Sequence, residues 1–149
     1  MTVIWTAMGM NNNRITLNQA IKFHGHLGPY LILGILAGAL AVKKLGCKRY
    51  FGLHIKVYGA KEKPMSCLID GLQLATGATY GKGNIEKLNG RDIRMIFSNS
   101  DDEKRIALSL NNNLTSKLRE LKGRRDSEML AKKLYKRKNY SNLFNLKTL

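Results

Sequence analysis

Apolar residues recur along this chain with two different periods, and each period predicts a different kind of secondary structure. Apolar residues recur at helical spacing over 16–24, where the hydroxyl of Thr16 is placed to cap the first turn. A second helix is expected to begin at Pro29 and to run to about Leu45, with Gly46 ending it. This second helix is apolar nearly all round, so we expect it at the centre of the core.

The middle of the chain changes to strict alternation, which is typical of a half-buried strand. The segment 51–59 places its apolar side chains on one expected face, namely Phe51, Leu53, Ile55 and Val57. A helix is then predicted over 65–75, opened by Pro64. A glycine-rich loop follows over 76–84, and a second strand over 92–98.

The last third of the chain returns to helical spacing. Asp101 is expected to cap a long helix, because an apolar stripe recurs after it at three- and four-residue steps. The members of this stripe are Ile106, Leu110, Leu114, Leu118 and Leu121. Gly123 interrupts the pattern, and a last helix is predicted over 127–137. Together these elements predict the α+β class: a small mixed sheet packed by helices, with a helical basic region over 101–149.

Length and composition agree with one globular domain over 1–149. The chain has 149 residues, of which 44% are hydrophobic and 24% charged, so a disordered or collagen-like chain is excluded. Cys47 and Cys67 are too few for a disulfide scaffold. The longest uncharged apolar stretch, 27–42, has 16 residues, whereas a membrane span needs about 20. Without a basic stretch ahead of the apolar start, the first residues do not resemble a signal peptide, and we expect a cytoplasmic protein with no membrane contact.

The net positive charge adds nucleic acid to the partners that this chain could bind. Lys and Arg number 26 against 10 acidic residues, which gives a net charge of +16. The segment 117–138 holds 10 basic and 3 acidic residues, and Tyr135 and Tyr140 lie in or beside it. Such a segment can bind nucleic acid through phosphates and stacked bases. A solvated amphipathic helix pair explains the same pattern and is the interpretation we favour. The apolar stripe offers another alternative, a non-catalytic helical protein that serves in assembly.

The strongest candidate chemistry lies at the break between the first two helices. His24 and His26 are two residues apart, and an extended segment would place both on one side. Cys67 and Asp70 are three residues apart on the third predicted helix, so they share a face. Near a helix N-terminus the thiolate of Cys67 would be stabilised. Two imidazoles and a thiolate form a ligand set for zinc, with one position left open. Asp70 is either a fourth ligand or the acceptor that orients an imidazole.

The glycine-rich loop 76–84 can be compared with a phosphate-binding P-loop but does not match it. Thr76 stands where that motif needs glycine, and Gly83 stands where it needs serine or threonine. The backbone N–H groups of the loop and the Lys82 ammonium can still hold an anion. His54 and Cys47 carry no such pattern, and we interpret both as structural residues.

Two blocks of this sequence resemble a known family. FHGHLGPYLILG, followed about forty residues later by CLIDGLQLATGATYGKGN, is similar to the FmdE family of formylmethanofuran dehydrogenase proteins over about 17–97. The resemblance implies an α+β core that binds a divalent metal ion, zinc foremost, and that tends to form homodimers. The paired histidines of the family fall on His24 and His26, its cysteine on Cys67 and its aspartate on Asp70. Further family positions, expected to shape the cleft, fall on Gln73, Thr76, Gly77, Gly81, Gly83 and Asn84, with Lys82 among them.

Three departures from the family pattern limit the chemistry that the resemblance implies. Many relatives have cysteine where this chain has Gly28, and another where it has Ala78. No cysteine follows Cys67, so we expect no counterpart of the C-terminal zinc finger of some relatives. We therefore expect a metal-binding protein, either an enzyme or an accessory protein of a larger complex, acting on a small anionic or one-carbon substrate. Asp70 and Lys82 are the residues to which we assign catalytic roles.

Overall fold

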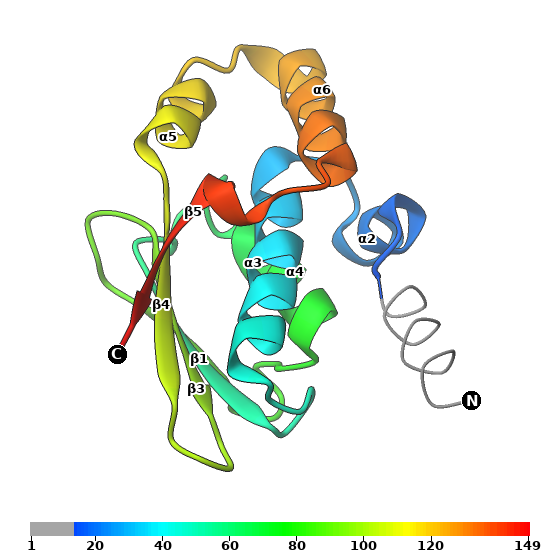
Figure 1. The fold of residues 1–149 in the computed structure, drawn as a ribbon. Coiled ribbons are helices and arrows are strands. Elements are labelled where there is room, and N and C mark those ends of the chain that lie inside the picture. The colour runs from blue at the N-terminus through cyan, green and yellow to red at the C-terminus, as the bar shows by residue number, and fades with distance from the viewer. Residues whose placement is uncertain (1–13) are drawn as a thin grey trace.

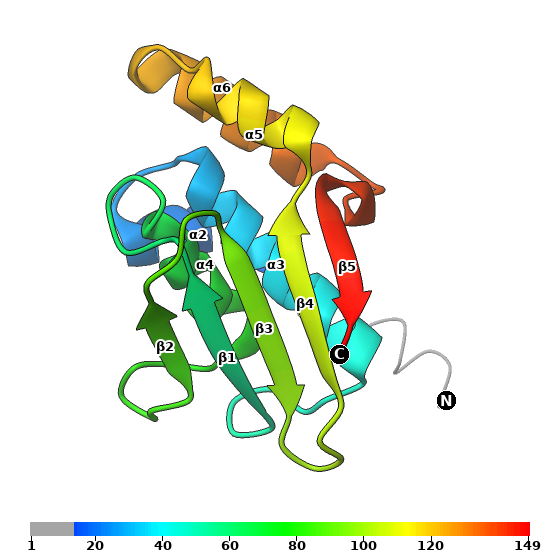
Figure 2. The ribbon, with the colours of Figure 1, turned by 90° about the vertical axis from the view of Figure 1, so that its left-hand side faces the viewer.

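The computed structural model describes residues 14–149, which form helices packed against one side of a five-stranded sheet (Figures 1 and 2). The helices are α2 (Leu17–His24), α3 (Pro29–Leu45), α4 (Cys67–Thr76), α5 (Asn112–Arg119) and α6 (Gly123–Lys136), with a short 3₁₀ turn η1 (Ser141–Leu143). The strands are β1 (Leu53–Tyr58), β2 (Ile85–Leu88), β3 (Arg94–Asn99), β4 (Arg105–Leu110) and β5 (Phe144–Thr148). The opening residues, for which we expect no signal peptide, lie outside the described part of the chain.

The sheet is mixed, as the sequence predicts. Its strand order is β2-β1-β3-β4-β5, and β1 pairs in parallel with β2 but antiparallel with β3. Ile55 and Val57 point inward from β1, and Met95 and Phe97 do so from β3, so one face of the sheet is apolar. That face packs on the helices and forms a single core, which confirms the predicted α+β class.

Helix α3 is the centre of this core, as its apolar sequence predicts. It crosses α4 so closely that the two backbones touch. A Cβ atom added at Gly34 would lie 2.1 Å from the carbonyl oxygen of Leu68, and one added at Gly71 would lie 2.1 Å from that of Leu31. Both crossing positions must therefore be glycine for the helices to approach this far.

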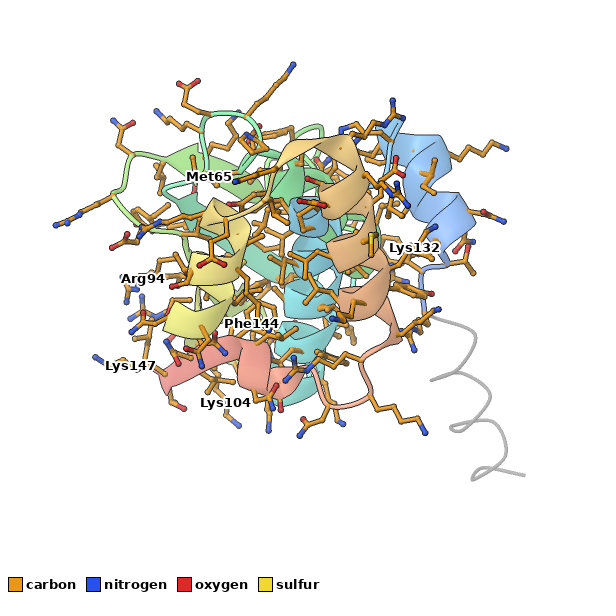
Figure 3. All side chains as sticks on the ribbon, turned by 90° about the horizontal axis from the view of Figure 1, so that it is seen from above. Met65, Arg94, Lys104, Lys132, Phe144 and Lys147 are labelled. Carbon is orange, nitrogen blue, oxygen red and sulfur yellow. The ribbon has the colours of Figure 1, made fainter. Side chains whose placement is uncertain are left out.

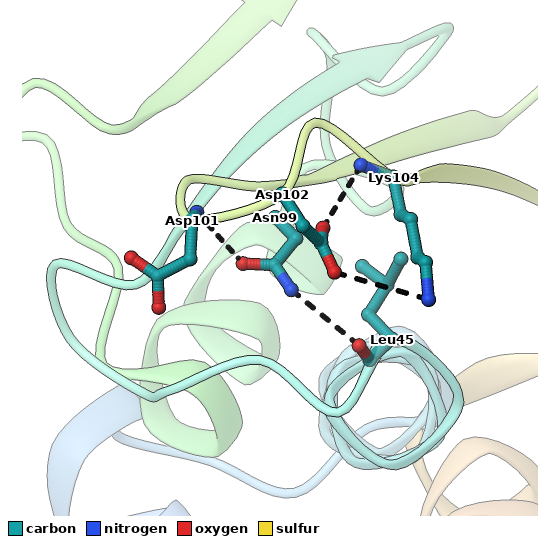
Figure 4. A network of polar contacts seen from close by, with 5 residues as sticks. All are labelled: Leu45, Asn99, Asp101, Asp102 and Lys104. Carbon is teal, nitrogen blue, oxygen red and sulfur yellow. Dashed lines mark hydrogen bonds and ion pairs between the residues drawn. The ribbon is translucent and has the colours of Figure 1, made fainter.

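The predicted long helix after Asp101 is wrong. Residues 105–110 form β4 instead, and the helix begins only at Asn112. Asp101 lies in the turn that joins β3 to β4, where its N–H donates to the Asn99 side chain at 3.0 Å. In the same turn Lys104 N–H donates to Asp102 at 3.0 Å, and Asn99 reaches the Leu45 carbonyl at the end of α3 (Figure 4). The turn is therefore anchored to the helix layer, and the chain reverses into a hairpin.

Smaller differences concern the sheet edges and one aromatic residue. Strands β2 and β5, at the two edges, were not predicted, so the region 101–149 is a mixture of strands and helices rather than helical throughout. Phe51 precedes β1 and is 75% exposed, contrary to its expected place on the buried face. Helix α6 begins at Gly123, four residues earlier than predicted.

Between residues 14 and 149, no single helix is long and apolar enough to cross a membrane. Helices α2 and α3 reach that length only as a pair, and the chain bends by 118° between them.

Candidate metal centre

The site begins with the way in which helix α2 ends. Thr16 caps its start, since its hydroxyl accepts the N–H of Gln19 at 3.1 Å. At the other end Gly25 adopts φ +100°, a left-handed conformation that glycine takes most readily. This residue turns the chain between the two histidines. The rings of His24 and His26 consequently lie together, with centroids 4.5 Å apart and planes inclined by 53°.

Helix α4 brings the third candidate ligand to the same place. Cys67 is the first residue of α4. Helix α4 packs on α3, the helix that follows the histidine turn in sequence. One ligand atom from each of His24, His26 and Cys67 can be chosen so that all lie within 4.8 Å of one another. The structure thus unites the three residues, although Cys67 lies more than forty positions from the histidines in sequence.

Asp70 determines which nitrogen of His24 is free. Its Oδ2 lies 2.6 Å from His24 Nδ1, and a carboxylate can only accept, so Nδ1 carries the proton. The other ring nitrogen, Nε2, is buried and has no hydrogen-bond partner among the described residues. Burying such an acceptor unpaired is costly, whereas a metal ion would satisfy it. Of the two roles left open for Asp70, the geometry favours the one that orients an imidazole.

A chain of contacts extends behind Asp70. Gln73 Nε2 lies 3.4 Å from Asp70 Oδ1, and the Gln73 side-chain oxygen accepts the N–H of Tyr80 at 3.2 Å. Gln73, predicted to shape the cleft, is therefore joined to the centre through Asp70. This arrangement links the histidine to the glycine-rich loop through side chains of α4.

The environment of Cys67 differs from the one that its helix position predicts. Burial raises the pKa of the Cys67 thiol, and the Asp70 carboxylate raises it further. Lys63 and the backbone lower it by less. The expected stabilisation of the thiolate by the helix N-terminus is therefore outweighed. The raised pKa favours the protonated thiol, and a bound cation would replace that proton.

A cavity of about 190 Å³ opens beside the cluster. Its wall includes His26 and Cys67, together with Tyr30 from α3 and with Arg124 and Ser127 from α6. No motif in the sequence singles out Arg124 or Ser127. They reach this wall because α6 packs on α3, a tertiary contact that no local pattern encodes. The cavity gives the centre room for a small ligand.

Lys82 and the other loop residues lie elsewhere. The Lys82 ammonium donates to Thr79 Oγ1 at 3.2 Å and lies 5.6 Å from the centroid of the Phe51 ring. Asn84 accepts the N–H of Thr79 and donates to the Leu53 carbonyl, so it ties the loop to β1. As far as residues 14–149 define it, the cavity beside the cluster has none of the following in its lining: Lys82, Gln73, Thr76, Gly77, Gly81, Gly83 or Asn84.

The other histidine and cysteine are placed apart from the cluster. His54 Nε2 lies 2.6 Å from Glu86 Oε2, across the β1–β2 pair. Cys47 is buried in the core cluster. Neither is part of the group that could hold a metal ion.

Comparisons with known proteins give this geometry a context. A family model described as "FmdE, Molybdenum formylmethanofuran dehydrogenase operon" matches residues 23–145. A crystal structure of a tungsten formylmethanofuran dehydrogenase FmdE-like protein from Syntrophus aciditrophicus superimposes with a TM-score of 0.57 at 20% identity. The match covers 87% of this chain and 67% of that one, and it shows a shared fold.

A curated relative from Archaeoglobus fulgidus is called a probable S-adenosyl-L-methionine-binding protein. It is 32% identical over 87 residues, which are 57% of this chain. The chain spans only 24% of the length of that relative.

Proposed function

We propose that this chain, which belongs to the FmdE family, binds one divalent metal ion, zinc, through His24, His26 and Cys67. The observation that carries the proposal is the buried, unpartnered Nε2 of His24. Imidazole nitrogen and thiolate sulfur are ligands that zinc prefers. The cluster offers both kinds of atom within 4.8 Å.

Three protein ligands support a reactive centre rather than a closed structural one. When bound, such an ion supplies a Lewis acid with an open coordination position. Asp70 holds the Nδ1 proton of His24 and so keeps Nε2 directed at the centre. The cavity beside His26 and Cys67 admits a ligand of a few atoms. Arg124 in its wall donates through Nε to Glu128 at 3.1 Å, so an anionic ligand would be held by its other guanidinium N–H groups. A small anionic or one-carbon substrate fits this arrangement, for an enzyme or for an accessory protein of a larger complex.

Elemental analysis tests the proposal. Wild-type protein purified without chelator is expected to hold about one zinc ion per chain, and His24→Ala and Cys67→Ala are expected to lose it. His54→Ala is a matched control, because His54 also pairs with a carboxylate at 2.6 Å but lies outside the cluster. Equal metal content in all four proteins, or none in wild type after reconstitution with zinc, would refute the proposal.

The remaining expectations stay predictions. Light scattering tests the homodimer that the resemblance implies. Binding of RNA across a range of salt concentrations tests the alternative of a nucleic-acid partner, because contacts to phosphates alone weaken steeply with salt. The segment 117–138 covers the end of α5 and all of α6, and Lys117, Lys133 and Arg137 line a groove of about 430 Å³ between these helices.

A further inference from the structure

A second and larger cavity, of about 810 Å³, lies where α5 meets the end of the sheet. Its wall combines the loop 90–93 and Arg94 with residues of α5 and with Tyr30 of α3. Figure 3, which looks down on this end of the molecule, shows Met65 and Arg94 beside α5; both belong to the wall. Segments from across the chain therefore meet here to border an open space much larger than the one beside the cluster.

Three arginines converge on this cavity. Arg91, Arg94 and Arg119 line it, and Asp92 is the one acidic residue among the described residues of its wall. Within residues 14–149, no carboxylate lies within ion-pair distance of any of the three. Unpaired basic side chains are numerous in a chain of charge +16. The distinctive feature is that three arginines, from separate elements, contribute to the wall of one concave space. A guanidinium group binds carboxylate and phosphate with two parallel hydrogen bonds.

Tyr30 connects this space to the candidate metal centre. It lines the arginine cavity and also the small cavity beside His26 and Cys67. Burial raises the pKa of the Tyr30 hydroxyl, and the charge of Arg119 opposes that rise. Arg119 is thus close enough to act on the residue that separates the two cavities. Pro64 and Met65, adjacent in sequence, line one cavity each.

We propose that the arginine cavity binds the oxyanion group, phosphate or carboxylate, of the small molecule on which the His24–His26–Cys67 centre acts. Arg91, Arg94 and Arg119 hold the anionic group, and the remainder of the molecule lies along Tyr30 toward the centre. This inference rests on the proposed function of that centre and names its substrate class. The anion site itself is built from residues that are not metal ligands, so the two proposals can fail separately.

Isothermal titration calorimetry at about 0.15 M salt, where exposed charges are largely screened, tests the site. Pyrophosphate and citrate serve as the phosphate and carboxylate probes, and the tighter of the two identifies the group. For that probe, Arg94→Gln and Arg119→Gln are each expected to weaken binding by about tenfold or more. Arg105→Gln is the matched control. It removes an arginine from β4, which also supplies cavity residues, but Arg105 does not line the cavity. Its affinity is expected to equal that of wild type.

The outcomes separate the two proposals. Equal loss of anion affinity in Arg94→Gln, Arg119→Gln and Arg105→Gln would show general attraction to a basic surface and would overturn the anion site. The absence of saturable binding of either probe to wild type would also overturn it. Metal content is measured on the same preparations, with melting temperature as the check on folding. Metal in wild type and unchanged anion affinity in the cavity variants would refute the anion site alone. If the cavity variants selectively lose anion affinity but wild type binds no metal, the metal centre is refuted. The link between the two sites is then refuted with it.

Discussion

The two helix pairs of this molecule are built in different ways. Helices α3 and α4 are apolar and largely buried, and their backbones touch at Gly34 and Gly71. Helix α5 is polar and α6 is highly charged, and the two helices bury only Leu114, Leu118, Ala131 and Leu134. The candidate metal ligands lie at or beside the ends of α2, α3 and α4, whereas α5 and α6 contribute to the cavity walls. The candidate ligands thus lie around the ends of the inner helices, whereas the outer pair supplies part of the walls of both cavities.

The largest expected effect comes from breaking the inner pair, α3 and α4. In Gly34→Ala the new Cβ would lie 2.1 Å from the Leu68 carbonyl oxygen and 2.9 Å from the Leu72 nitrogen, which are backbone atoms that cannot move aside locally. We expect the free energy of unfolding, measured with urea, to fall by about 3 kcal/mol or more. Gly81→Ala is the control, because its Cβ would meet no atom closer than 3.8 Å, and it should change stability by at most about 0.5 kcal/mol. Equal stability of the two variants would contradict the close crossing.

The next largest effect tests how Asp70 of α4 contributes to metal binding by His24. Asp70→Asn removes the carboxylate that fixes the His24 tautomer, so zinc affinity should fall about 10- to 100-fold while saturating stoichiometry is retained. Competition with a chromophoric chelator measures the affinity. Glu86→Gln removes the matching carboxylate from His54 and should leave affinity unchanged. Wild-type affinity in Asp70→Asn would exclude an orienting role for Asp70, and loss of the bound ion at saturation would make it a ligand.

A smaller effect is expected in the outer pair. The side-chain oxygen of Asn111 caps α5 by accepting the Leu114 N–H at 2.7 Å, and its amide donates to the Asn142 carbonyl at 2.6 Å. Asn111→Ala should therefore cost about 1 kcal/mol of unfolding free energy. Asn113→Ala, in the first turn of the same helix and without a side-chain hydrogen bond in the described structure, is the comparison. A cost as large as that of Gly34→Ala would mean that the outer helices are as firmly integrated as the inner ones.

The inner half of the fold can be predicted from the sequence because its elements carry clear local signals. The cap at Thr16, the proline at position 29 and the alternation of β1 each have one structural interpretation. The stripe from Ile106 does not, because residues spaced by four share a face on a strand as well as on a helix. Here Ile106 and Leu110 lie on β4, while Leu114 and Leu118 lie on α5. The strands that decide this by pairing with β4 are β3 and β5, and β5 is distant in sequence.

The candidate site, like the fold, can be predicted from the sequence only in part. His24, His26 and Cys67 could be proposed from spacing and helix position, and the structure brings them together. The raised pKa of the Cys67 thiol could not be predicted, because burial and the Asp70 carboxylate act on this thiol only once the tertiary fold exists. Arg124 and Arg119 enter the cavities through the packing of helices that have no motif of their own.

The position of β5 has a consequence for biosynthesis. The ribosome releases this chain from its N-terminus, so α3, α4 and β1 can assemble while residues 144–148 are still being added. Until then the edge of β4 has no partner, and α5 lacks the backbone hydrogen bond from Asn111 to Leu143 that ties its start to the end of the chain. The candidate metal ligands can therefore meet before residue 145 is added, whereas the wall of the arginine cavity, which includes Asn145, can be completed only after it.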